Sequence, residues 1–62
     1  MDGHRAQLSS LATALDELTG RVTALADDVR EDEEELALDL YEVERSLRAA
    51  TRRLGAVVRR LP

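Results

Sequence analysis

DDVREDEEE, residues 27–35, separates two apolar repeats that mirror each other. Before this segment Leu and Val recur every three or four residues, and after it the same spacing continues in reverse order about a centre between Asp32 and Glu33. Apolar side chains at this spacing form a stripe along one side of an α-helix, which another helix must cover. The pattern therefore predicts two helices that are joined near residues 31–34 and pack antiparallel.

The 62-residue chain is long enough for one small domain. We expect an all-α hairpin with a first helix at about 4–30, an acidic turn at about 31–34 and a second helix at about 35–61. Asp2 or Gly3 is suited to the N-cap of the first helix. Asp32 is suited to the N-cap of the second, with Glu35 three residues later as in a capping box.

One continuous helix in an antiparallel coiled coil is the alternative. The segment 27–35 contains no Gly or Pro, so local propensity permits an unbroken helix. In a dimer of such helices, however, Asp32 and Glu33 of both chains would crowd carboxylates around the centre without a cation, which is strongly disfavoured. A turn exposes these carboxylates, and we therefore favour the hairpin.

The heptad positions of the apolar residues predict which side chains pack within the hairpin. With Leu8 and Leu40 as a sites, the a and d sites from Leu8 to Val29 and from Leu36 to Val57 are Leu, Val or Ala. We expect them to form the intramolecular seam, which consists of Leu8, Leu11, Leu15, Leu18, Val22, Leu25, Val29, Leu36, Leu40, Val43, Leu47, Ala50, Leu54 and Val57.

The e sites beside this seam are mostly small and uncharged, which widens the apolar stripe to a width typical of bundle helices. A lone hairpin covers each stripe only in part, so we expect two hairpins to dimerise into a four-helix bundle. The expected oligomer interface consists of Ala12, Thr19, Ala26, Ala37, Thr51 and Val58.

Charge is distributed unevenly between the two halves of the chain. Residues 1–35 hold ten acids and three Arg, whereas residues 36–62 hold three acids and six Arg. Antiparallel pairing places the acidic half beside the basic half, which favours that arrangement.

Two groups on the outside of the second helix could contact a partner. Arg45, Arg48, Arg52 and Arg59 form a basic stripe, either a solvated face that complements the helix dipole or a strip for phosphate. Leu38 and Tyr41 lie out of the seam, one turn apart, and could form a contact near the turn. These six residues are the possible partner patch.

The residue types present give no basis for an enzyme. The chain has no Cys, a single His and no Gly-rich phosphate loop or Ser, His and Asp set, so we expect no catalysis, metal or cofactor. No apolar run approaches the about 18 residues that span a bilayer. We expect a cytoplasmic oligomerisation or adaptor module that binds itself or another helical protein, and the alternative is a small nucleic-acid-associated regulator that uses the Arg stripe.

Overall fold

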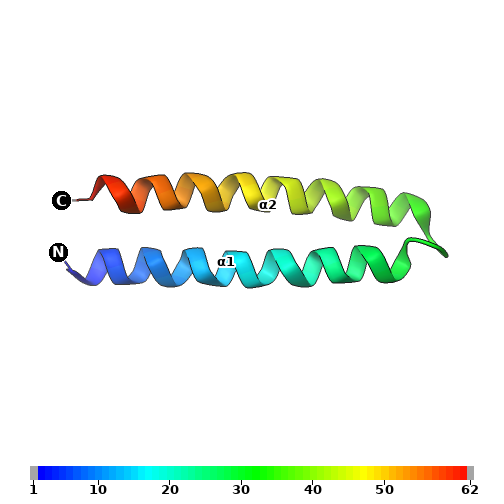
Figure 1. Ribbon diagram of the computed structural model, residues 1–62, viewed down its shortest axis with the longest axis horizontal. Helices are drawn as coiled ribbons and strands as arrows, with labels where there is room; N and C mark the ends of the chain where they lie inside the picture. The colour runs from blue at the N-terminus through cyan, green and yellow to red at the C-terminus, as the bar shows by residue number, and fades with distance from the viewer. Residues whose placement is uncertain (1, 62) are drawn as a thin grey trace.

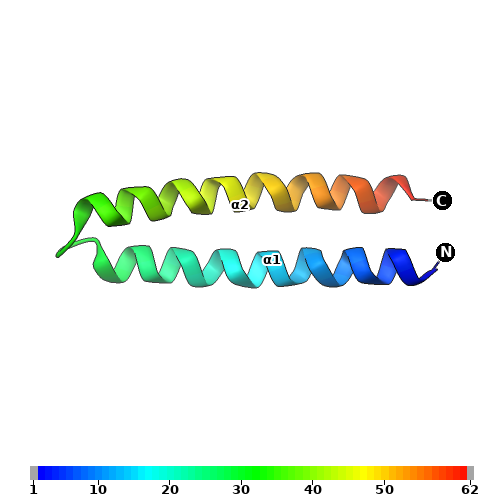
Figure 2. The ribbon, with the colours of Figure 1, turned by 180° about the vertical axis from the view of Figure 1, so that it is seen from behind.

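The computed structural model describes residues 2–61 and shows a helical hairpin (Figure 1). Helix α1 spans Asp2–Val29, helix α2 spans Glu34–Arg60, and the molecule measures 48 × 14 × 9 Å. The start of α1 and the end of α2 lie together at the open end of the hairpin, opposite the turn, and the view from behind shows the same arrangement (Figure 2). The predicted antiparallel hairpin is confirmed, and the continuous helix is wrong.

The turn, residues 30–33, reverses the chain without glycine. The Glu33 amide donates a hydrogen bond to the Val29 carbonyl oxygen over 2.7 Å at the end of α1, and the Ala37 amide donates to the Glu33 carbonyl oxygen over 3.0 Å at the start of α2. No residue within 2–61 has a positive φ. Glycine is needed where φ is positive, so its absence from this segment does not oppose the turn.

The start of α2 differs from the expected capping box. Its N-cap is Glu33, with φ −138° and ψ 74°, and no side chain caps the helix. Asp32 is therefore not the N-cap, and that prediction is wrong. Glu34 and Glu35 lie in the first turn of α2 instead, where the helix dipole favours their negative charge.

The ends of the hairpin away from the turn also depart slightly from expectation. Gly3 lies inside α1 and Asp2 is its first residue, so neither acts as the predicted N-cap. Helix α2 ends at Arg60, and Leu61 is extended, with φ −69° and ψ 142°. A residue before proline favours this extended conformation, which explains why α2 ends there.

The side chains between the helices come from the a and e sites. Ala26, Ala37 and Thr19 are buried, with 0%, 1% and 3% of their surface exposed. From Leu8 onward the remaining a and e sites of α1 and α2 are half-buried, namely Leu8, Ala12, Leu15, Val22, Val29, Leu40, Glu44, Leu47, Thr51, Leu54 and Val58. The core of the hairpin is therefore a narrow strip of alternating large and small residues.

This core corrects two predictions. The d sites expected in the seam are exposed, namely Leu11, Leu18, Leu25, Leu36, Val43, Ala50 and Val57. The e sites expected to contact a second hairpin are instead buried or half-buried within the single chain, namely Ala12, Thr19, Ala26, Ala37, Thr51 and Val58. The cause is steric, because two helices approach more closely when small residues lie between them.

The buried and half-buried a and e sites are symmetric in sequence about Glu33, half a residue from the expected centre. This register places small residues of one helix opposite larger ones of the other, as with Ala26 and Leu40 or Val29 and Ala37. A hydrogen bond at the open end agrees with it, because Arg5 Nη2 donates to the Leu61 carbonyl oxygen over 2.9 Å, and these two residues are also equidistant from Glu33. The alternation of sizes lets the layers interdigitate.

Candidate protein-protein interface

The d sites of both helices form a surface that we call the apolar face. Its large members keep 40–55% of their surface exposed and are Leu11, Leu18, Leu25, Leu36, Val43 and Val57. Ala50 completes the set. The half-buried Leu and Val of the a sites lie between the two d rows, so the apolar surface crosses the width of the hairpin and runs along most of its length.

Helix geometry places both d rows on the same broad side of the hairpin. Successive residues are rotated by about 100° around the helix axis, so d sites lie to one side of the buried a and e strip and b sites lie to the other. Because α1 and α2 are antiparallel, equivalent sites of the two helices point to the same broad side of the pair. The apolar face is therefore continuous across α1 and α2.

The opposite broad side is polar, and a b residue of α2 is bonded there to an f residue of α1. The Tyr41 hydroxyl on α2 donates a hydrogen bond to Asp27 Oδ1 on α1. This bond raises the pKa of Tyr41 above its ordinary value of 10.0, with a smaller contribution from burial. The hairpin thus has one polar side with direct contacts between helices and one apolar side without a covering element.

Glu44 lies between the helices at the edge of the polar side. Arg48 Nη2 lies 2.8 Å from Glu44 Oε2, and Arg48 Nε donates to the same oxygen over 2.9 Å. These contacts, followed by the Thr23 hydroxyl, hold the pKa of Glu44 below its ordinary value of 4.5. The Glu44 side chain is only 17% exposed, so its carboxylate is part of the packing between α1 and α2.

The side chains of the predicted Arg stripe are exposed, but ion pairs neutralise part of it. Arg48 pairs with Glu44, and Arg45 Nη2 lies 3.6 Å from Glu42 Oε2. Arg52 lines a shallow groove together with Asp16, Arg48 and the threonines Thr19 and Thr51. The stripe therefore lies among carboxylates, which oppose the binding of phosphate.

The structure separates Leu38 from Tyr41. Leu38 is 58% exposed on the outer side of α2, away from the apolar face. Tyr41 is half-buried and bound to Asp27 on the polar side. These two residues do not form one apolar docking patch.

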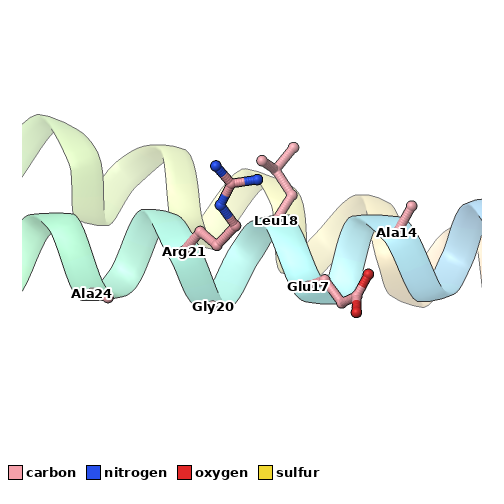
Figure 3. A pocket seen from close by; sticks show the side chains of 6 residues that line it. All are labelled: Ala14, Glu17, Leu18, Gly20, Arg21 and Ala24. Atoms are coloured by element: carbon pink, nitrogen blue, oxygen red, sulfur yellow. The ribbon is translucent and has the colours of Figure 1, made fainter.

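The hollows on the described part of the surface are open depressions. A shallow hollow follows the outside of α1, where Leu18 and Arg21 extend from the helix beside Gly20 and Ala24 (Figure 3). All its lining residues come from one helix, so it is an open depression of the surface. No group of three His, Asp or Glu side chains within the described residues could hold a metal ion.

Charge also varies along the length of the hairpin. The turn end, residues 27–35, carries seven acids and one Arg, for a net charge of −6. The open end, residues 2–5 and 52–61, carries five Arg and one Asp, for a net charge of +4. The hairpin is therefore acidic at the turn end and basic at the open end.

Sequence reasoning missed two contacts of this surface. Glu44 occupies an e site with Arg48 four residues later, a spacing that signals an ion pair, but nothing in that spacing shows that the carboxylate packs between the helices. The Tyr41 bond to Asp27 depends on the register of the two helices, which local sequence does not reveal.

Comparison of the chain with protein-family models, curated proteins and solved structures found no match. Neither α1 nor α2, within residues 2–61, is long and apolar enough to cross a membrane. The functional argument therefore rests on the faces of the hairpin.

Proposed function

We propose that this chain is a non-catalytic oligomerisation or adaptor module that acts in the cytoplasm and binds other helices through its apolar face. The observation that supports this is the continuous row of exposed Leu and Val across both helices. Soluble monomers rarely leave contiguous apolar patches larger than a few hundred Å² uncovered, and larger patches mark interaction sites. A second helical hairpin of similar shape would cover this face as half of a four-helix bundle.

Chain length supports the same proposal. Domains near 60 residues bury a small fraction of their surface and are marginally stable alone. Among the residues whose burial the structure describes, 3–61, only Ala26, Ala37 and Thr19 are buried, and none of them is a large side chain. Covering the apolar face would add the burial of the large Leu and Val side chains, each contributing about 1.5–3 kcal/mol when buried completely.

The proposal is tested by a matched pair of substitutions on and off the apolar face. Leu18→Glu places a carboxylate on the apolar face, whereas Leu38→Glu makes the same change on the outer side of α2, where Leu38 is already 58% exposed. The probes are the chain itself and a designed amphipathic peptide with Leu at a and d sites. We expect the parent and Leu38→Glu to bind at least one probe and Leu18→Glu to lose that binding.

Sedimentation for the self-probe and fluorescence anisotropy for the peptide report the binding. Circular dichroism at the same concentrations checks that both variants remain helical. If the parent binds neither probe, or if Leu18→Glu and Leu38→Glu bind alike, the apolar face is not an interaction surface and the proposal fails.

A further inference from the structure

We infer that the apolar face is covered by a second copy of this chain, packed so that the turn of each hairpin lies beside the open end of the other. This inference rests on the proposed function and specifies both the partner and its orientation. It is carried by the separation of charge along the hairpin.

Two face-to-face copies related by a twofold axis have two orientations. With the axis along the helices, both turns lie at the same end of the bundle. With the axis across the helices, the turns lie at opposite ends. Every helix has antiparallel neighbours in both cases, so apolar contact and helix dipoles do not separate the two.

The distribution of charge distinguishes the two orientations. The same-end orientation brings two turn ends of net charge −6 together and two open ends of net charge +4 together. The opposite-end orientation places each acidic turn end beside a basic open end. Opposite charges attract and like charges repel within about 10 Å at ordinary ionic strength. The opposite-end orientation is therefore favoured at both ends of the bundle.

The apolar sites also match in this orientation. When the turn of one hairpin is level with the open end of the other, Leu15 lies opposite Leu18 of the second copy, and Leu11 lies opposite Val22 of the second copy. Each pair joins an a site to a d site, so large apolar side chains of the two copies meet. At the flank of the same face, Asp39 comes level with Arg60 of the second copy, which gives a pair of opposite charge.

The orientation is measured by dipolar spectroscopy between single spin labels. The chain has no native cysteine, so Asp32→Cys accepts one label, at the turn. In the opposite-end dimer the two turn labels are separated by nearly the 48 Å length of the hairpin. In the same-end dimer they are separated by about 20 Å, roughly two helix diameters.

A second label position distinguishes a wrong orientation from a missing dimer. Glu17→Cys lies near the middle of α1 on the exposed surface, so two copies in either orientation bring its labels within about 30 Å of each other. The inference is supported if the two labels at position 17 of the dimer are close together while the two labels at position 32 are far apart. If the labels of the two copies are close together at both positions, the opposite-end orientation is overturned.

If the labels at position 17 show no dipolar coupling, the inference that a second copy of this chain covers the apolar face is overturned. The proposed function would survive that result if the amphipathic peptide still binds the parent and not Leu18→Glu. It would fail if neither probe binds.

Charge reversal at the open end provides an independent test, because the two orientations predict opposite changes in the affinity of the dimer. In the opposite-end dimer, the double change Arg59→Glu and Arg60→Glu places acids beside the acidic turn of the second copy, and we expect the dissociation constant to rise about twofold to fivefold for each exposed pair lost. In the same-end dimer this change relieves Arg crowding and tightens binding. A lower dissociation constant for the double variant would therefore overturn the inference.

Discussion

Ala26 on α1 and Ala37 on α2 are both completely buried, on either side of the turn, where the two helices approach each other. Neither site has room for a larger side chain unless the helices move apart. The close approach of α1 and α2 near the turn therefore depends on the small size of both residues.

The substitution Ala26→Leu is expected to destabilise the hairpin by about 1–3 kcal/mol, because added methylene groups in a packed core force backbone shifts. Ala24→Leu is the matched control, since Ala24 is exposed on the same helix. Urea unfolding at one fixed protein concentration measures both. Equal midpoints for the two variants would show that the a and e strip is not the packed core.

Gly20→Ala is expected to stabilise the protein by up to about 1 kcal/mol, the difference in helix propensity between these residues. Gly20 lies within α1, and a Cβ atom added there meets nothing within 4 Å. Gly3→Ala, at the first turn of α1 and equally free of neighbours, should give a smaller gain because helix ends fray. Thermal unfolding at matched concentrations compares them, and a loss of stability in Gly20→Ala would contradict the assignment of this site to open surface.

Tyr41 is expected to titrate above pH 10.0, because its hydroxyl proton is held by Asp27. The raised pKa favours the neutral form in the folded state, so the bond stabilises the fold below pH 10.0 and this stabilisation is lost as pH rises through the folded-state pKa. Tyr41 is the single tyrosine and the chain has no Trp, so absorbance at alkaline pH follows it directly. Asp27→Ala should return the pKa toward 10.0, whereas Asp28→Ala should not.

Glu44 is expected to make the protein less stable at acid pH. Its pKa lies below 4.5 in the folded state, so its carboxylate stabilises the fold above pH 4.5 and this contribution is lost as pH falls through the lower folded-state pKa. Glu44→Gln should weaken the pH dependence of the unfolding midpoint in that range. Glu42→Gln is the control, because Glu42 pairs with Arg45 while 67% exposed, and a comparable effect in both variants would argue against a special role for Glu44.

The hairpin could be predicted from sequence because its determinants are local and repeated. The spacing of Leu and Val required helices, and the carboxylates of Asp32 and Glu33 opposed a continuous one. Both helix boundaries near the turn lie within one residue of the expected positions, with α1 ending at Val29 and α2 starting at Glu34. The cap of α2 was not predictable in the same way, since Asp32 fits the residue preferences of an N-cap but the turn gives that position to Glu33.

The choice of packing face could not be made from hydrophobicity. The a and d sites and the a and e sites both recur at intervals of three and four residues, so both describe stripes that a second helix can cover. The d sites carry Leu11, Leu18 and Leu25, which are more apolar than Ala12, Thr19 and Ala26 at the e sites. Within the chain the small residues are inside because they permit close approach, and this leaves the larger residues of the d sites exposed.

The four-residue turn also determines the order in which the hairpin assembles. Opposed residues are close in sequence beside the turn, as with Val29 and Ala37, and they are 56 residues apart at the Arg5 to Leu61 hydrogen bond. The entropy lost on closing a loop increases with the number of residues that it contains. We therefore expect contacts beside the turn to form first during folding and those at the open end to form last. On heating we expect the reverse order, in which the helices separate first at Arg5 and Leu61 and last at Ala26 and Ala37.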